Sequence, residues 1–464
     1  MSVNVELFDI SQFDQYYANL NYGAAFGFYA NASKMGLKKH DTYSTDHLNY
    51  LLDAYEQDRT VPAEKPNVVV IMNESFSDLA AVGEFDTNIP YLQFTNSLSK
   101  NTKKGQLMVS PFGGITCNSE YEFLTGMNVG LLSPGAMPYM QMMFDDVPYS
   151  MVSHMKALGY HTTAFHPFAK NGWNREKVYK YFGFDEFIGI DEMGEYDPDP
   201  SELRSYVSDV SDYDTVLNYL RSDAPGVRQF IFNVTIQNHG GYQYPYPYFK
   251  EDVTLSGMDG SYPQTEQYLT LMKNSDEALE YFIGELKKLD EPTIILLFGD
   301  HQPGVEREFY EELYGKTLEQ LTSEELARRY FVPFIIWANY DIEKEEDIHT
   351  SPCFLGGKLL DAAGLPKSRV HMYLDDIQTI VRQLNPLGWY ESDGTWHYSP
   401  MTAALDSYYD MQYAILKNQP LDYDFDYPAD KPEDAADRPE EDISESAEET
   451  AQPTEAAEIG RAHV

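Results

Sequence analysis

The chain has 464 residues, which is enough for one large α/β domain with additions or for roughly two to three average domains. Acidic residues outnumber basic residues by 75 to 33, and the formal net charge of −42 argues against a nucleic-acid ligand, because phosphate backbones would be repelled. The two cysteines exclude a disulfide scaffold and a CxxC metal motif, and no signal peptide or run of about 18 apolar residues occurs.

The first 64 residues have the pattern of helices and connecting segments. One helical stretch lies around residues 14–17, and another covers residues 44–57 with four apolar side chains on one face: Leu48, Leu51, Leu52 and Tyr55. Pro62 and Pro66 then interrupt the pattern. Residues 67–72 form a continuous β-branched and apolar run, which is typical of a buried parallel strand and marks the start of the core domain.

Strands and helices alternate through the rest of the core. We predict helices at 151–158, 265–289 and 374–384, and strands at 162–165, 230–234, 293–298 and 332–337. This alternation predicts an α/β domain over residues 65–420, with a mostly parallel central sheet, helices on both faces and a smaller C-terminal α+β portion. In such sheets, ligand sites form at the carboxyl ends of the strands.

The C-terminal segment has a different composition. Residues 421–464 are rich in Asp, Glu, Pro, Ser and Ala without periodicity, which predicts an acidic disordered tail. The last seven residues, EIGRAHV, can be encoded by the start of a common sequencing-library adapter. We therefore expect that these seven residues are an artefact of the gene sequence.

Four residues at the ends of predicted elements have the chemistry of a metal site. Glu74 follows the first strand, and Asp300 and His301 follow the strand at 293–298, so two hard carboxylates and an imidazole are expected at one sheet edge. Thr116 follows two glycines near the start of a predicted helix, where a phosphoryl oxygen is favoured. A divalent cation can deprotonate such a hydroxyl, so the set indicates transfer of a phosphorus- or sulfur-centred group.

Each of these residues also has a structural interpretation. Glu74 alone could be a helix cap or a solvated loop acid, and the local pattern at Thr116 favours a capping box. The pair Asp300-His301 is harder to explain structurally, because neither side chain has an apolar role after a buried strand.

Further polar residues follow the other predicted strands. His239 precedes two glycines in a sharp turn, where it could ligate a metal, hold a phosphate oxygen or do neither. Arg175 could bind phosphate oxygens with two N–H groups, and Trp173 could form an apolar wall, although surface packing of an amphipathic helix is the alternative explanation for both. The loop at 242–248 alternates tyrosine with proline and could line a groove for an extended polymer or pack on the domain.

Five segments, in order, resemble motifs of one known family. They are Asn73-Glu74-Ser75-Phe76, Gly113-Gly114-Ile115-Thr116 with Ser119-Glu120, Phe165-His166 with Trp173-Asn174-Arg175, Asn238-His239, and Phe298-Gly299-Asp300-His301. Together they resemble the extracellular catalytic domain of the lipoteichoic acid synthase family. That family consists of phosphoglycerol transferases of the alkaline phosphatase and sulfatase superfamily. The likeness covers about residues 60–390.

The resemblance implies a site and a reaction. Glu74, Thr116, Asp300 and His301 would hold one divalent cation, for which the family favours Mn²⁺, although Mg²⁺ and Zn²⁺ also suit the ligands. Thr116 would be the nucleophile. The substrate-binding residues would be His166, Trp173, Arg175 and His239.

The resemblance also implies substrates and a location. Glycerol phosphate would pass from a phosphatidylglycerol-like lipid to a glycolipid or polyglycerolphosphate acceptor. Residues 1–64 resemble the helical linker that follows a membrane domain in this family, so we expect an N-terminal anchor in the intact protein. The catalytic domain would then lie outside the cell membrane.

Two departures from the family bear on the substrate. Phe168 occupies a position, five before the tryptophan, where the family has an acidic residue. Cys117 directly after the nucleophile is unusual for the family, but it does not begin the sulfatase signature Cys-x-Pro-x-Arg, because Asn118-Ser119-Glu120-Tyr121 follow it, and sulfatase activity is therefore not expected. A phosphodiesterase or phosphatase of the same superfamily and a non-catalytic binding domain are the alternative functions.

Overall fold

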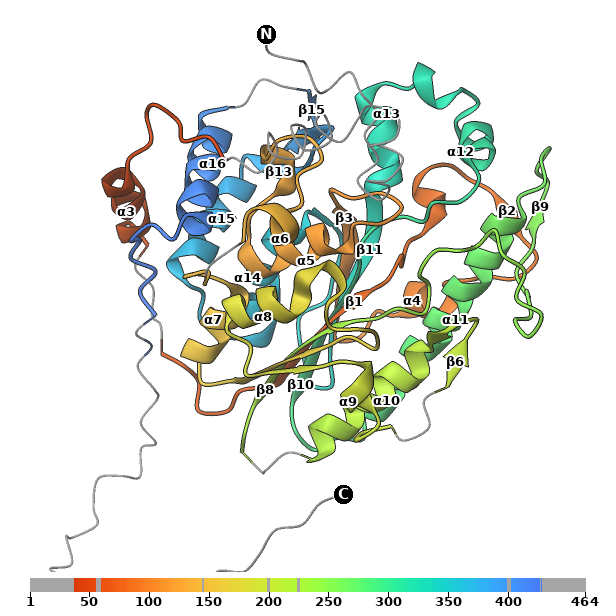
Figure 1. The fold of residues 1–464 in the computed structure, drawn as a ribbon, viewed down its shortest axis with the longest axis horizontal. Helices are drawn as coiled ribbons and strands as arrows, with labels where there is room; N and C mark the ends of the chain where they lie inside the picture. The colour runs from red at the N-terminus through yellow and green to blue at the C-terminus, as the bar shows by residue number, and fades with distance from the viewer. Residues whose placement is uncertain are drawn as a thin grey trace, which may run out of the picture.

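A computed structural model describes residues 37–55, 60–143, 146–197, 201–222, 226–398, 402–425 and 427. Its centre is an eight-stranded sheet in the order β12-β3-β11-β10-β1-β8-β4-β5 (Figure 1). The strands are β1 (Asn67–Asn73), β3 (Thr102–Met108), β4 (His161–Phe165), β5 (Glu186–Ile188), β8 (Gln229–Val234), β10 (Thr293–Gly299), β11 (Phe331–Ala338) and β12 (Glu345–Thr350). Within this sheet β11 runs antiparallel to β10 and β3, and the other pairs are parallel, which confirms the mostly parallel sheet.

The central strands are buried on both faces, as their apolar sequences predict. On β1, Val68, Val70 and Met72 join one hydrophobic core, whereas Val69 and Ile71 join the other. The first core is covered by α5 (Thr116–Thr125), α7 (Met151–Ala157), α8 (Arg175–Phe182) and α14 (Pro352–Ala363). The second core is covered by α10 (Asp209–Ser222), α11 (Pro263–Leu286) and α12 (Arg307–Tyr314) (Figure 1).

A smaller C-terminal part adjoins the first core. Its antiparallel sheet consists of β13 (Val381–Asn385), β14 (Gly388–Glu391) and β15 (Trp396–His397), and its helices are α15 (Arg369–Gln378) and α16 (Ala403–Leu416). The N-terminal helix α3 (Thr45–Asp53) packs on this part, where Arg369 bonds to Asp53 at 2.8 Å. The predicted C-terminal α+β portion is thus confirmed.

The remaining elements are short. The helices are α4 (Gln93–Ser97), α6 (Pro138–Gln141), α9 (Ile190–Met193) and α13 (Ser323–Ala327). The paired strands are β2 (Asp86–Thr87) with β9 (Leu255–Ser256), and β6 (Glu202–Leu203) with β7 (Tyr206–Val207). Single 3₁₀ turns are Leu79–Ala81, Val129–Leu131, Gly172–Asn174, Leu318–Gln320 and Arg328–Tyr330.

One predicted helix is wrong. Residues 374–384 do not form a continuous helix, because α15 begins earlier, at the cap formed by Ser368, and ends at Gln378. The β-branched Val381 then begins a strand that pairs with β14. The predicted helical stretch at 14–17, the tail from residue 428 and its last seven residues lie outside the described residues. No described helix is long and apolar enough to cross a bilayer.

Glu122 makes stability depend on pH. Its carboxylate is fully buried on α5 and accepts hydrogen bonds from the Ser110 hydroxyl and the Val129 N–H. Burial raises its pKa to about 8, and these two hydrogen bonds oppose the rise. Because the folded state holds this proton more tightly than the unfolded state, its stabilising effect is complete at acidic pH and is lost as pH rises to about 8.

We therefore predict that the free energy of unfolding falls between pH 5 and pH 8, and that Glu122→Gln removes on the order of 1 kcal/mol per pH unit of this fall. Denaturant unfolding of both proteins at several pH values measures the difference. The control is Glu176→Gln, which changes an exposed acid on α8. Parallel pH profiles of the Glu122 variant and the unchanged protein would contradict the prediction.

Candidate metal and nucleophile site

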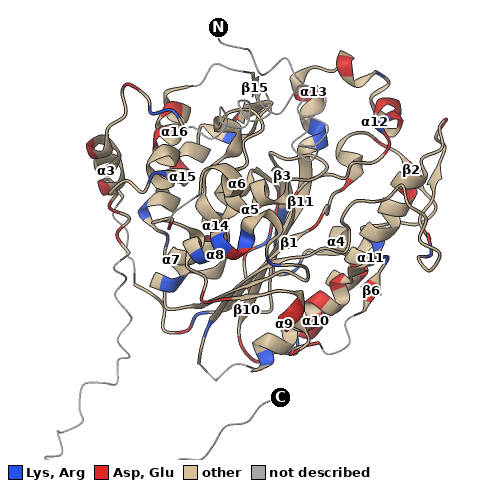
Figure 2. Ribbon diagram, in the orientation of Figure 1, with Lys and Arg blue, Asp and Glu red and all other residues tan. Residues whose placement is uncertain are grey.

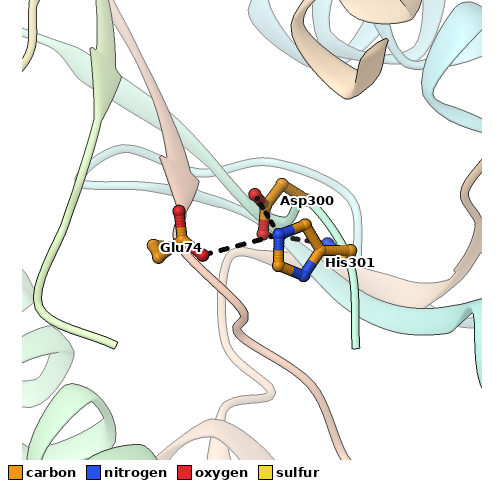
Figure 3. Close-up of side chains that lie close together, drawn as sticks. All are labelled: Glu74, Asp300 and His301. Atoms are coloured by element: carbon orange, nitrogen blue, oxygen red, sulfur yellow. Dashed lines mark hydrogen bonds and ion pairs between the residues drawn. The ribbon is translucent and has the colours of Figure 1, made fainter. Parts of the chain in front are cut away.

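The carboxyl ends of β1 and β10 bring three potential ligands together. Asn73 and Gly299 are paired in the parallel register, so Glu74 and Asp300 leave the sheet side by side. The Nε2 atom of His301 lies 3.2 Å from Asp300 Oδ2 and 3.5 Å from Glu74 Oε1 (Figure 3). All three side chains are buried. The structure therefore forms the predicted cluster of two carboxylates and one imidazole.

Hydrogen bonds orient the remaining atoms of this cluster. Asp300 Oδ1 accepts from the N–H groups of Ser75 (2.7 Å) and His301 (2.8 Å). His301 Nδ1 lies 2.9 Å from the carbonyl oxygen of Gln302, to which an N–H at Nδ1 can donate, and Nε2 faces the two carboxylates. Burial raises the pKa of Asp300 to about 6; His301 opposes the rise and the Glu74 carboxylate adds to it.

The two atoms that face the centre of the cluster fit a cation. Asp300 Oδ2 and His301 Nε2 are buried and, apart from their 3.2 Å approach to each other, have no hydrogen-bond partner among the described residues. A buried polar atom without a partner is costly, whereas a divalent cation would satisfy both atoms and offset the repulsion between the two carboxylates. Oxygen ligands with one imidazole suit Mn²⁺ and Mg²⁺, and Zn²⁺ accepts the same donors.

Thr116 adds a hydroxyl to the same cluster. It is the first residue of α5, after a turn in which Gly113, Gly114 and Ile115 all have positive φ. The hydroxyl Oγ1 donates to Glu74 Oε2 at 3.4 Å. The residue at the cap position is Ile115, and no side chain caps this helix, so the capping-box interpretation of Thr116 is wrong.

Arg175 lies in a buried network behind the nucleophile helix. Its Nε (2.9 Å) and Nη2 both bond to Glu120 Oε1, and the Tyr179 hydroxyl donates to Glu120 Oε2 at 2.8 Å. Its Nη1 lies 3.0 Å from His166 Nε2, and His166 Nδ1 faces the Val234 carbonyl oxygen at 2.8 Å. Burial and the charge of Arg175 hold the pKa of His166 well below its usual range, so His166 is neutral and accepts from Arg175.

This network limits what the two residues can offer a substrate. Three of the five N–H groups of Arg175 are already engaged, so two remain for phosphoryl oxygens. Both ring nitrogens of His166 are engaged as well. Direct substrate binding by either residue stays a prediction.

His239 lies in the loop that follows β8 and contacts Tyr206 and Arg204. The ring is exposed to solvent, and its Nδ1 lies 3.1 Å from the Tyr206 hydroxyl. Burial of part of the ring lowers the pKa of His239; the nearby His301 lowers it further, and Asp300 opposes the shift. Trp173 lies half-buried against the first core, with a positive φ of 51°.

Several residues of the site could not be identified from sequence. Ser75 and Gln302 orient the ligands through backbone atoms, which any residue type supplies. Glu120 lies in one of the five family-like motifs. Its pairing with Arg175 joins residues 55 positions apart in the chain, so the local sequence does not predict it. The role of Tyr206 depends on a two-stranded hairpin that the sequence analysis did not predict.

A family model described as sulfatase matches residues 66–365, which include every ligand of the cluster. The chain belongs to the sulfatase family. Cys117, the residue after Thr116, lies in the hydrophobic core, and burial raises the pKa of its thiol.

Several bacterial proteins are similar to the chain in sequence. The chain is 30% identical to a putative cyclic beta-1,2-glucan modification protein of Rhizobium meliloti, over 65% of this chain and 46% of the relative. It is 26% identical to a lipoteichoic acid synthase of Staphylococcus aureus, over 62% of this chain and 44% of that protein. The chain thus spans about half the length of these relatives.

A solved structure of the Streptococcus pyogenes phosphoglycerol transferase GacH, in complex with sn-glycerol-1-phosphate, has the same fold. The TM-score is 0.65 at 20% sequence identity, and the match covers 82% of this chain and 95% of that chain. The likeness confirms an alkaline phosphatase/sulfatase-like fold for the sulfatase-family domain.

We predict that Asp300→Asn weakens Mn²⁺ binding by at least about tenfold, because an amide replaces a charged ligand. Titration calorimetry on chelator-treated protein measures the effect. Asp347→Asn is the control, because Asp347 is exposed and belongs to no such cluster. Equal Mn²⁺ affinity in the Asp300 variant and the control would argue against the site.

A second prediction concerns the buried ion pair. Glu120→Ala leaves the Arg175 guanidinium buried without its carboxylate, and we expect the free energy of unfolding to fall by about 3–5 kcal/mol. Glu277→Ala breaks the exposed pair with Lys273 on α11 and should cost less than about 1 kcal/mol. Urea denaturation compares the two, and similar losses would contradict the difference in burial.

Proposed function

We propose that this domain is a metal-dependent phosphoglycerol transferase. It would move glycerol phosphate from a phosphatidylglycerol-like lipid to an acceptor hydroxyl on a glycolipid or polymer, through a covalent intermediate on Thr116. The observation that carries the proposal is the position of the Thr116 hydroxyl at the first turn of α5, hydrogen-bonded to Glu74 of the buried cluster that Glu74 forms with Asp300 and His301. The relatives named lipoteichoic acid synthase and the fold shared with a phosphoglycerol transferase support it.

The ligands would be Glu74, Thr116, Asp300 and His301. A divalent cation bound there would lower the pKa of the Thr116 hydroxyl and neutralise charge on the transferred group. Mn²⁺ is the proposed ion, by the family resemblance. The free N–H groups at the start of α5 add a positive field where the phosphoryl oxygens would lie.

The reaction would proceed in two displacements. In the first, Thr116 Oγ1 forms a bond to the donor phosphorus, the bond to the diacylglycerol oxygen breaks, and that oxygen receives the proton that Thr116 loses. In the second, an acceptor hydroxyl forms a bond to phosphorus, the bond from phosphorus to Thr116 Oγ1 breaks, and the hydroxyl proton returns to Thr116. His239 and the two remaining N–H groups of Arg175 would bind the phosphoryl oxygens, and Trp173 would border the glycerol.

A covalent intermediate separates two bulky substrates in time. The lipid product can leave before the acceptor enters, so one small site serves both. By the same resemblance, the full-length protein would act at the cell membrane with this domain outside.

We predict that the protein incubated with Mn²⁺ and a phosphatidylglycerol analogue gains the mass of one glycerol phosphate. Thr116→Ala should not gain it, because the variant lacks the attacking oxygen, and Thr116→Ser should retain it. Intact-protein mass spectrometry gives the result directly, and chelator treatment should abolish the adduct.

The same experiment tests the alternative. Release of glycerol phosphate into water at the same rate with and without acceptor would favour a phosphodiesterase of this superfamily. No adduct on protein that binds Mn²⁺ would refute the proposed donor.

A further inference from the structure

Helix α10 begins with a buried carboxylate that is bonded to the segment just before His239. Figure 2 shows acidic residues along this helix, and the first of them, Asp209, is fully buried. The hydrogen-bond partners of its carboxylate are amide and hydroxyl groups. A carboxylate removed from water is costly unless partners bond to it, so breaking these hydrogen bonds would be strongly unfavourable. None of the five family-like motifs contains Asp209.

The partners of Asp209 come from three separate elements. Its Oδ2 atom accepts hydrogen bonds from Asn73 Nδ2 (3.0 Å), Ser275 Oγ (2.6 Å) and Gln237 Nε2 (3.4 Å). The N–H of Asp209 donates to Gln237 Oε1 at 2.9 Å. Asn73 ends β1, Gln237 follows β8 and Ser275 lies on α11. One oxygen atom therefore joins the ends of two neighbouring strands to the helices α10 and α11.

Asn238 extends these contacts toward the site. Its side chain is fully buried, and Nδ2 donates to Asn73 Oδ1 (3.2 Å) and Ser275 Oγ (2.9 Å). Both acceptors belong to side chains that also bond to Asp209. Two of the five buried residues in this set directly precede His239. We call the set the Asp209 network: Asn73, Asp209, Gln237, Asn238 and Ser275.

The network supports His239 more than it supports the metal ligands. Glu74 also follows a network residue, but the main-chain pairing of β1 with β10 sets its position. His239 lies in a turn after β8, where its N–H donates to the Ile236 carbonyl oxygen at 3.0 Å. Arg204, in the β6–β7 hairpin, bonds to carbonyl oxygens of the same turn. The Asp209 network holds this turn from its buried side.

We propose that Asp209 is a positioning residue for His239. Through the side chains of Gln237 and Asn238, it fixes the turn that presents the imidazole to the phosphoryl group. The inference rests on the proposed function, in which His239 binds phosphoryl oxygens. Asp209 itself would touch neither the cation nor the substrate, so its loss should weaken donor binding and leave Mn²⁺ binding intact.

The test uses the whole chain with Mn²⁺ and measures the rate of adduct formation by intact mass over a range of concentrations of the phosphatidylglycerol analogue. We expect Asp209→Ala to raise the KM for this donor by about tenfold, near the lower end of what one hydrogen bond to a charged group contributes. Asp209→Asn should restore the lower KM, because its amide oxygen can accept the same hydrogen bonds and its NH₂ group replaces Oδ1, which has no partner among the described residues. Asp276→Ala is the matched control, since Asp276 is also buried on α11 but bonds to the N–H groups of Phe94 and Thr95.

A double variant shows whether Asp209 acts through His239. In a His239→Ala background, Asp209→Ala should raise the KM no further, because the side chain that it positions is already gone. A general loss of structure would instead add to the effect of His239→Ala. Titration calorimetry should give every variant the Mn²⁺ affinity of the unchanged protein.

Three outcomes would overturn the positioning role and leave the proposed function standing: an unchanged KM in folded Asp209→Ala, a further rise of the KM in the double variant, or a loss of Mn²⁺ binding in Asp209→Ala. If circular dichroism shows that Asp209→Ala does not fold, Ser275→Ala takes its place, because it removes a single hydroxyl from the network. The KM should then rise in Ser275→Ala, and an unchanged KM would overturn the role. No adduct on unchanged protein that binds Mn²⁺ would overturn both the role and the proposed function.

Discussion

The parallel register of β1 and β10 is the constraint on which the site depends. Asn73 pairs with Gly299, so Glu74 and Asp300 emerge level with each other and at bonding distance from His301. Gly299 makes this possible, because a Cβ atom there would lie 1.9 Å from the carbonyl oxygen of Phe76. The chain after β1 therefore folds directly over the end of β10, which lets the Ser75 N–H reach Asp300.

Backbone strain is concentrated around the site. Nine described residues other than glycine have positive φ, and five of them adjoin the site: Ser75, Ile115, Trp173, Asn174 and Arg204. Each such conformation costs of the order of 1–3 kcal/mol, and the β-branched Ile115 is an especially poor fit to it. The cost is offset by the two hydrophobic cores that fix the flanking strands. Strain retained at Ile115 places the Thr116 hydroxyl at the cluster, where a side-chain cap would have turned it toward the backbone.

Sequence predicted the parts of the molecule that depend on local pattern. Sequence predicts β1 and β10 because strands that are buried on both faces are continuously apolar. It also predicts the polar residues directly after them as a site, because ligand sites of parallel sheets form at the carboxyl ends of the strands. The predicted helix at 374–384 is wrong at its C-terminal end, because Leu374, Ile377 and Val381 have the spacing of one helix face although Val381 begins a strand. The Glu120–Arg175 pair and the hairpin that carries Tyr206 arise from contacts between distant segments, for which one sequence contains no signal.

The central sheet positions the candidate metal ligands Glu74, Asp300 and His301. Phe168 follows β4 and Tyr206 lies in the β6–β7 hairpin, both outside the central sheet, so they can change without altering its register. Arg175 is buried and paired with Glu120, so part of its positive charge is already neutralised. A cation held by Glu74, Asp300 and His301 would therefore add positive charge where the proposed phosphoryl group lies. The proposed chemistry thus depends on the sheet edge, whereas the loops outside the central sheet can differ between substrates.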